Sequence, residues 1–370
     1  MSQTDAYIGL GTNLGERKHF IDEAAALLGQ THETEVVKTT EPVETIPLGH
    51  LNQPPYLNAV VHLKTNLSAS NLHKRLIEIE DALERKRGKK WASRNIDLDL
   101  LLFGNEIIKT DRLIVPHPQM HLRSFVLTEL CKINPKLVHP VLNETVDVLA
   151  SRLNGDNYAP LSDKSWLVSI AGNIGAGKTT LTKKLAASLY CRSIFEAYDK
   201  NPFLPKVYAG NKDLALSSQL FFLTSRVEQL NPSIKEKNTP LVTDYVFQKE
   251  LIYANLLLSK EQQSLYNKIY SQVEPCVVRP SLVLWLTDSP QVCLERIHSR
   301  NRPYEQQIQL SFLQAIDSGY KEMLAGWKIS PVIALNDFDC LSQQAADKLA
   351  EKIKYYINPS STYNLSPAQT

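Results

Sequence analysis

The chain has 370 residues, of which 43% are hydrophobic and 22% charged; this composition is typical of folded globular domains and excludes long disorder or a fibrous repeat. The 41 Lys and Arg residues nearly balance the 39 Asp and Glu residues, for a net charge of +2, so no global field attracts nucleic acid or an anionic membrane. The five cysteines form no CxxC or Cys/His metal pattern, and no signal peptide or bilayer-length apolar run occurs. We therefore expect a cytoplasmic protein with free thiols.

The length favours two domains of ordinary size. A helical pattern ends over residues 145–153, and NGDNYAPLSDKS (154–165) then gathers the residue types of loops. A buried-strand pattern restarts at Trp166, whereas the C-terminal NPSSTYNLSPAQT has too little apolar content to fold. The predicted organisation is a first domain over 1–155, a linker over 156–165, a second domain over 166–357 and a disordered tail over 358–370.

The first domain mixes strand and helix patterns. Strands are predicted over residues 6–9, 57–63 and 96–103, and helices from near residue 15 and over about 68–85. The second helix has apolar residues at helical spacing behind Ser68 or Ser70, either of which is a natural N-cap. Two helices on an antiparallel sheet, an α+β sandwich, is the economical packing.

A strongly basic run, RKRGKKWASR, occupies residues 85–94 and places six basic residues around Trp91. Such a run alone fits a nucleic-acid contact or a solvated surface. Its positive charge would also bind a triphosphate. The segment that follows decides between these interpretations.

Residues 95–104, NIDLDLLLFG, form a predicted buried strand that carries two acids. Side chains alternate along a strand, so Asp97, Asp99 and Leu101 share one face. Two carboxylates about 7 Å apart repel each other, but they suit Mg²⁺ ions that also touch a polyphosphate. A pair of solvent-facing acids is the alternative, and the adjacent basic run favours the metal site with a mobile phosphate-binding loop. The opposite face is predicted to be apolar, with Ile96, Leu98, Leu100 and Leu102.

Residues 6–150 resemble the 6-hydroxymethyl-7,8-dihydropterin pyrophosphokinase family. The resemblance rests on GLGTNLG, ETIPLGHLNQPPYLNAVV, RNIDLDLLLFG and RLIVPHPQMHLRSFVL. It implies a ferredoxin-like fold, ATP as co-substrate and two Mg²⁺ ions on Asp97 and Asp99. It also implies ATP or phosphate contacts for Arg85, Arg87, Arg94, His117 and Arg123, and pterin contacts for Thr45, Leu48, Tyr56, Asn58, Trp91 and Phe125.

The second half alternates short apolar strands with long amphipathic stretches. The strand patterns are LVSIAG, SIFEAY, PLVTDY, SLVLWLT and PVIAL. This alternation predicts an α/β domain in which helices cover both faces of a parallel sheet.

Residues 172–180, GNIGAGKTT, fit the phosphate-binding motif G-x-x-x-x-G-K-[ST] between a strand and a helix. Backbone N–H groups would face the phosphates, Lys178 would reach the β and γ oxygens, and the Thr179 hydroxyl would hold Mg²⁺. A chance glycine-rich turn is the alternative. The predicted ATP-binding residues are Gly172, Asn173, Gly175, Ala176, Gly177, Lys178, Thr179 and Thr180.

Three arginines, Arg296, Arg300 and Arg302, lie on a predicted helix and the turn after it. This spacing can close guanidinium groups over a transferring phosphate, and a solvated basic helix face is the alternative. Together with the phosphate-binding motif, the cluster favours a catalytic lid.

Residues 166–357 resemble the deoxynucleoside kinase family, on the phosphate-binding motif, FEAYDKNPFLPKVYAG, SSQLFFLTSR and the arginine lid. The resemblance implies Glu196 as general base for a 5′-hydroxyl and Asp244 as a ligand of Mg²⁺-bound water. Family members usually carry Asp/Glu-Arg-Ser where this chain has Asp244, Tyr245 and Val246, and Lys249 lies near the usual position of an acid that helps select the base. The implied deoxynucleoside contacts are Tyr208, Gln219, Arg226 and Glu305.

The two halves together predict a bifunctional transferase. The first would form AMP and a pterin pyrophosphate from ATP, and the second would form ADP and a deoxynucleoside 5′-phosphate. The alternative is that only the first half catalyses, while the second is a nucleotide-binding regulatory or assembly module. The expected partners are small-molecule substrates, with a homodimer through the second half and without nucleic acid or membrane.

Overall fold

The computed structural model describes residues 3–47, 53–84, 94–158, 166–232 and 240–357. Contacts divide the described residues into two compact units, 3–158 and 166–357. Within the described ranges, no helix has the length and apolar character needed to cross a bilayer. Several predictions lie outside the described residues: those for Leu48, Arg85, Arg87 and Trp91, for the tail 358–370 and for most of the linker 156–165.

The N-terminal unit is built on an antiparallel sheet with strand order β2-β4-β1-β5, and β3 pairs with β4 beside β2. With one helix after β1 and another after β4, this is the ferredoxin-like α+β arrangement that was predicted. Its main elements are β1 (Thr4–Thr12), α1 (Arg17–Gly29), β2 (Thr34–Thr39), β3 (Val43–Thr45), β4 (Tyr56–Thr65), α2 (Ala69–Ala82) and β5 (Asp97–Phe103). They are followed by β6 (Ile108–Lys109), β7 (Ile114–Val115), α3 (Ser124–Ile133), β8 (Val138–His139), β9 (Glu144–Thr145) and α4 (Val146–Ser151).

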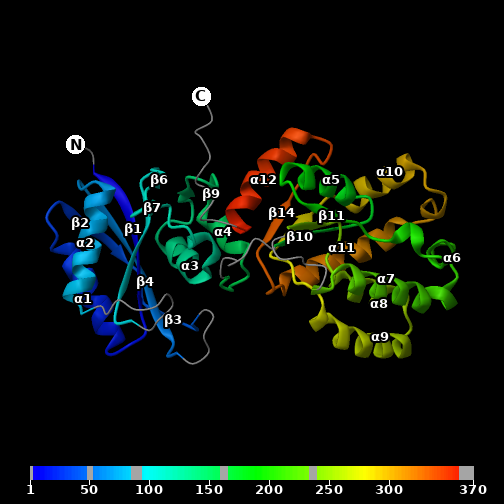
Figure 1. Ribbon diagram of the computed structural model, residues 1–370, viewed down its shortest axis with the longest axis horizontal. Helices are drawn as coiled ribbons and strands as arrows, with labels where there is room; N and C mark the ends of the chain where they lie inside the picture. Colours follow the sequence, from blue (N-terminus) through cyan, green and yellow to red (C-terminus); the bar gives the residue numbers. More distant parts are fainter. Residues whose placement is uncertain (1–2, 48–52, 85–93, 159–165, 233–239, 358–370) are drawn as a thin grey trace. The chain divides into compact units, whose positions relative to one another are not determined.

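Helices α1 and α2 cover one face of this sheet (Figure 1). Of the two predicted N-caps, Ser68 is the one observed: its hydroxyl accepts a hydrogen bond of 3.3 Å from the backbone N–H of Asn71. Apolar residues of both helices and of the central strands form one core, which includes Ile8, Leu28, Val61, Leu72, Leu76 and Leu98. A pocket lies on the opposite face of the sheet, next to α3.

Strand β5 shows how the two acids are accommodated. Ile96, Leu98 and Leu100 join the helix-facing core, as predicted, and this leaves Asp97 and Asp99 on the other face. The prediction for Leu102 is wrong, because Phe103 takes its place in the core cluster. The cause is a register shift between β5 and β1 that interrupts the alternation of side chains.

Strands β2 and β3 were not predicted from the sequence. Strand β2 ends the sheet, and its residues are mostly exposed. An edge strand buries few side chains, so it shows little of the apolar pattern that reveals a central strand.

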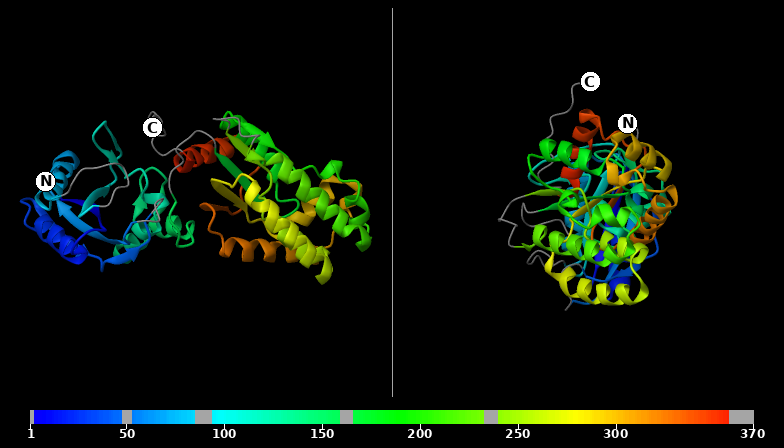
Figure 2. Two further views of the ribbon diagram at one scale, coloured as in Figure 1. Left: turned by 60° about the horizontal axis from the view of Figure 1, so that its bottom comes forward. Right: turned by 90° about the vertical axis from the view of Figure 1, so that its right-hand side faces the viewer.

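The C-terminal unit has a parallel sheet with strand order β11-β12-β10-β13-β14. Helices α5 and α12 lie on one side of the strands and α7, α8 and α11 on the other (Figure 1), and Figure 2 shows α12 and α11 on opposite sides from another direction. This is the predicted α/β fold with both faces covered. The strands are β10 (Leu167–Gly172), β11 (Arg192–Ile194), β12 (Leu241–Thr243), β13 (Leu282–Leu286) and β14 (Val332–Leu335). The helices are α5 (Lys178–Ser188), α6 (Leu204–Tyr208), α7 (Ala215–Gln229), α8 (Lys249–Leu257), α9 (Lys260–Val273), α10 (Pro290–Arg300), α11 (Leu310–Ala325) and α12 (Gln343–Ile357).

Strands β11 and β12 are shorter than predicted, and their ends place functional side chains. Strand β11 stops at Ile194, just before Glu196, and β12 stops at Thr243, just before Asp244. Because the carboxyl ends of parallel strands meet at one edge of the sheet, these acids lie next to the loop that follows β10.

Candidate active sites

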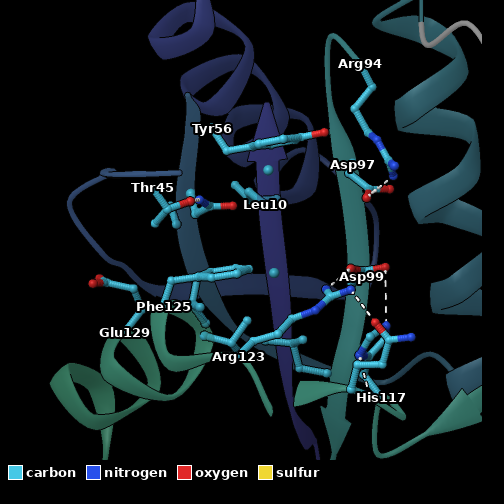
Figure 3. A pocket seen from close by; sticks show the side chains of 18 of the residues that line it. Leu10, Thr45, Tyr56, Arg94, Asp97, Asp99, His117, Arg123, Phe125 and Glu129 are labelled. Carbon is cyan, nitrogen blue, oxygen red and sulfur yellow. Dashed lines mark hydrogen bonds and ion pairs between the residues drawn. The ribbon is translucent and has the colours of Figure 1, made fainter. Parts of the chain in front are cut away.

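A pocket of about 310 Å³ opens on the face of the N-terminal sheet opposite α1 and α2. It lies between β1, β4 and β5 on one side and α3 on the other (Figure 3). The structure therefore brings together the predicted residues that it describes in this unit: Thr45, Tyr56, Asn58, Arg94, Asp97, Asp99, His117, Arg123 and Phe125.

Both acids of β5 face cations inside this pocket. The guanidinium of Arg94 bonds directly to Asp97. Arg123 Nη1 lies 3.4 Å from Asp99 Oδ2, and His117 Nε2 lies 3.9 Å from Asp99 Oδ1. The two guanidinium groups, of Arg94 and Arg123, relieve the repulsion between the two carboxylates.

His117 is in its neutral form at neutral pH. Burial lowers its pKa to about 4, although Asp99 acts in the opposite direction. Its Nδ1 accepts a hydrogen bond of 3.3 Å from the backbone N–H of Gln119. The ring proton therefore lies on Nε2, where it can be donated to an oxygen in the pocket.

Two aromatic rings flank the pocket. Tyr56 and Phe125 lie across from each other, both seen nearly edge-on in Figure 3. Asn58 is buried beside them, and its amide donates a hydrogen bond of 2.8 Å to Thr45 Oγ1. A flat ring can stack between two such aromatic faces while amide and hydroxyl groups bind its polar edge.

Two residues that hold pocket side chains or segments in place were not predicted from the sequence. The buried side chain of Asn13 accepts a hydrogen bond of 2.9 Å from the backbone N–H of Arg94 and donates to Gln53, so it joins two segments that border the pocket. Gln119 accepts a hydrogen bond of 2.8 Å from Arg123. Asn13 lies in GLGTNLG and Gln119 in RLIVPHPQMHLRSFVL, but no role was predicted for either. The role of Asn13 depends on contacts with residues 40 and 81 positions away.

The loop after β10 has the geometry that the phosphate-binding motif predicts. Gly175 adopts a φ of 83°, and an added Cβ would lie 2.4 Å from the carbonyl oxygen of Cys293, so only glycine fits. Lys178 is the first residue of α5, and its Nζ donates a hydrogen bond of 2.7 Å to the carbonyl of Asn173. Burial lowers the pKa of Lys178 to about 8. Of the predicted residues in this loop, Gly175, Lys178 and Thr179 line a second pocket.

Asp244 connects three elements at the base of this second pocket. Its Oδ2 accepts a hydrogen bond of 2.7 Å from the Thr179 hydroxyl, and its Oδ1 accepts one of 2.8 Å from the backbone N–H of Glu196. A hydroxyl and a carboxylate thus meet at the N-terminus of α5, where the helix dipole and the free backbone N–H groups favour an anion such as a phosphate.

The predicted base, Glu196, lies in a network of buried charges. Arg226 bonds to one of its oxygens, and Lys249 Nζ lies 2.7 Å from the other. Arg226 also pairs with Glu250, which accepts a hydrogen bond from Tyr266. Gln219, one of the predicted deoxynucleoside contacts, is buried, and it lines the pocket together with Tyr208, Arg226 and Glu305.

The predicted lid is only partly assembled at the pocket. Arg300 and Arg302 line it and pair with Glu305, and Arg302 Nη2 also donates a hydrogen bond of 2.6 Å to Tyr198. Arg296 does not line the pocket, because it pairs with Asp288 at 2.6 Å. Tyr198 lies in the segment FEAYDKNPFLPKVYAG, but no role was predicted for it from the sequence.

The donor atoms at both sites are those that Mg²⁺ prefers. Asp97 and Asp99 offer carboxylate oxygens, and Thr179 and Asp244 offer a hydroxyl and a carboxylate. Mg²⁺ commonly takes one or two protein carboxylates and completes its shell with water and phosphate oxygens, so these sets fit it. Among the described residues, no group of three or more His, Cys, Asp or Glu side chains is arranged to hold a metal.

Comparison with known proteins assigns a family to each unit. The family model described as 7,8-dihydro-6-hydroxymethylpterin-pyrophosphokinase matches residues 7–135, and the one described as deoxynucleoside kinase matches residues 168–358. The fold and sites define a chain of two kinase-type transferase units. The chain belongs to the hydroxymethyldihydropterin pyrophosphokinase family through its N-terminal unit and to the deoxynucleoside kinase family through its C-terminal unit.

The two relatives found by sequence agree with this assignment. A 2-amino-4-hydroxy-6-hydroxymethyldihydropteridine pyrophosphokinase from Bacillus subtilis is 44% identical over 128 residues, covering 35% of this chain and 77% of the relative. Deoxyguanosine kinase from Bacillus subtilis is 34% identical over 157 residues, covering 42% of this chain and 76% of the relative. A structure of deoxyadenosine kinase from M. mycoides with bound dATP aligns at 19% identity and a TM-score of 0.45, covering 51% of this chain and 99% of that one.

Proposed function

We propose that the N-terminal unit transfers a pyrophosphoryl group from ATP to 6-hydroxymethyl-7,8-dihydropterin and releases AMP. The carrying observation is the pocket itself, in which the carboxylates of Asp97 and Asp99 lie on the same sheet face as the gap between Tyr56 and Phe125. A bicyclic ring between the aromatic faces would bring its hydroxymethyl group near the phosphate-binding side, and such positioning supplies much of the rate enhancement.

The residues of this pocket divide into two proposed roles. Asp97 and Asp99 would hold Mg²⁺, which supplies charge neutralisation to the triphosphate when bound. Arg94, Arg123 and neutral His117 would bind phosphate oxygens directly. The proposed pterin contacts are Thr45, Tyr56, Asn58 and Phe125. We also propose pterin contacts for Leu48 and Trp91, and phosphate contacts for Arg85 and Arg87.

We infer that the C-terminal unit transfers the γ-phosphoryl group of ATP to the 5′-hydroxyl of a deoxynucleoside. The bond that forms joins the 5′-oxygen to the γ-phosphorus, the bond that breaks joins that phosphorus to the β,γ-bridging oxygen, and Glu196 accepts the hydroxyl proton. ADP is the product. The supporting observation is that Glu196 lines the same pocket as Lys178, the proposed phosphate-binding lysine. Glu196 lies two residues beyond Ile194, the last residue of β11.

The other residues of this pocket would position and neutralise charge. The loop 172–180 and Lys178 would hold the ATP phosphates, while Thr179 and Asp244 would hold Mg²⁺ and its water. Arg300 and Arg302 would stabilise the transferring group. The proposed deoxynucleoside contacts are Tyr208, Gln219, Arg226 and Glu305.

Deoxyguanosine is the first substrate to test, because the relative from Bacillus subtilis is a deoxyguanosine kinase. Purified chain should be given ATP and Mg²⁺ with the pterin, and separately with each of the four deoxynucleosides, and the nucleotide products separated. AMP with the pterin and ADP with at least one deoxynucleoside would support both proposals. A failure to form either product would refute the corresponding one.

One observation favours a second candidate, a C-terminal unit that binds nucleotide without catalysis. The positions where the family carries Arg and Ser are Tyr245 and Val246, and both are fully buried away from the pocket. If Glu196→Gln abolishes ADP formation while leaving ATP affinity intact, the binding-module candidate fails. We favour catalysis because a candidate base, its partners and two lid arginines share one pocket.

A further inference from the structure

Lys249 is a buried cation whose partner is the predicted general base. Its side chain is almost fully buried, and its Nζ lies 2.7 Å from Glu196 Oε2. It is also the first residue of α8, where the helix dipole disfavours a positive charge. An ammonium group in this position is unfavourable unless it is paired, so the contact with Glu196 stabilises it there.

The residue that follows Asp244 cannot provide this contact. Tyr245 packs in an apolar cluster with Phe247, and its hydroxyl donates a hydrogen bond of 2.7 Å to Gln229. Its side chain does not line the pocket, whereas that of Lys249 does. The chain therefore has no arginine after Asp244, yet it supplies a cation to Glu196 from the start of the next helix.

We propose that Lys249 is a positioning residue for Glu196. Its ammonium group holds one carboxylate oxygen while Arg226 holds the other, and this fixes the orientation of the carboxylate that accepts the substrate proton. Each oxygen keeps a further lone pair for that proton. The proposal rests on the kinase function inferred above.

The charges around this contact come from several elements. Besides Arg226 of α7, the nearby charged or titratable groups are Lys178 of α5, Asp244 after β12, and Glu250 and Tyr253 of α8. Arg226 should keep its contact with Glu196 when Lys249 is neutralised, because it bonds to the other carboxylate oxygen. Loss of the ammonium therefore frees the carboxylate to rotate without leaving it unpaired.

Lys249→Met removes the charge and nearly conserves the length of the side chain. The kcat for ADP formation should fall about 10- to 100-fold, because orientation of the base is lost. The KM for ATP should change less than about threefold, because the phosphate-binding loop is unaltered. The matched control is Lys260→Met, which neutralises the exposed first residue of the next helix, α9, and should keep the wild-type kcat.

Restoring a cation at position 249 tests whether Lys249 positions Glu196 or only stabilises the fold. Lys249→Arg should recover most of the lost kcat, because a guanidinium can make the same contact. In Lys249→Ala, added ethylammonium should raise kcat about fivefold or more, whereas ethanol of similar size should not.

The outcomes are distinct. A wild-type kcat in Lys249→Met overturns the proposal, and so does a loss that neither arginine nor ethylammonium restores. If the unmodified chain forms no ADP with any deoxynucleoside, the kinase function itself fails and this inference fails with it. Activity of the unmodified chain therefore distinguishes the two failures.

Discussion

The Thr179 hydroxyl donates a hydrogen bond of 2.7 Å to the Asp244 carboxylate, 65 positions further along the chain. The other oxygen of Asp244 accepts from the backbone of Glu196. One carboxylate thus joins the first turn of α5 to the carboxyl ends of β11 and β12. This arrangement places the predicted metal-binding and proton-accepting groups of the kinase site next to each other.

Substitution Asp244→Asn should lower the kcat for ADP formation by about 100-fold or more, because the amide removes a negative charge from the proposed Mg²⁺ position. AMP formation by the N-terminal unit should be unchanged in the same preparation. Asp213→Asn, which alters an exposed acid of the same unit, is the control. Equal ADP formation by both variants would show that Asp244 has no such role.

Phe125→Leu should weaken pterin binding in the N-terminal pocket. Loss of one stacking face should raise the KM for the pterin about 3- to 10-fold, which corresponds to the usual energy of an aromatic pair. The KM for ATP should stay constant, because the proposed phosphate contacts are made by other side chains, those of Arg94, His117 and Arg123. Steady-state assays of AMP formation measure both constants, and an effect on ATP alone would contradict the assigned orientation.

The kinase reaction should slow at alkaline pH, because Lys178 then loses its charge. Burial lowers its pKa to about 8, so the ammonium form that binds phosphate is present at pH 7 and is lost as the pH rises through 8 in the free protein. The kcat/KM for ATP in ADP formation should therefore fall on the alkaline side of about pH 8. In Lys178→Arg any residual activity should lack this limb. A flat profile to pH 10 in the unmodified chain would contradict the prediction.

The N-terminal unit should be less stable in acid, because His139 is buried in its neutral form. Burial lowers its pKa to about 3, and its Nδ1 accepts a hydrogen bond of 3.2 Å from the backbone of Leu142. The unfolded chain binds a proton below about pH 6.5, whereas the folded chain does not, so the free energy of unfolding should fall as the pH drops from 6.5 toward 3. Thermal unfolding at pH 8 and pH 5 measures this loss. His139→Asn should reduce the pH dependence, and an unchanged slope would exclude His139 as its source.

Most of the fold was predictable because its signals are local. The alternation in NIDLDLLLFG, the apolar strands of the second half and the glycine-rich loop each depend on neighbouring residues. The edge strand β2 and the displacement of Leu102 were not predictable, since one buries little and the other depends on pairing with β1. The same limit applies to the sites: motifs marked Asp97 and Lys178, whereas the contacts of Asn13 and Tyr198 arise only in three dimensions.

The central claim is that one chain carries two independent phosphoryl-transfer sites. Its most direct test compares Asp97→Asn and Glu196→Gln in the purified chain, with AMP and ADP formation measured side by side. We predict that Asp97→Asn loses AMP formation and keeps ADP formation, and that Glu196→Gln does the reverse. Loss of both products in either variant, or of neither product in both, would contradict the claim.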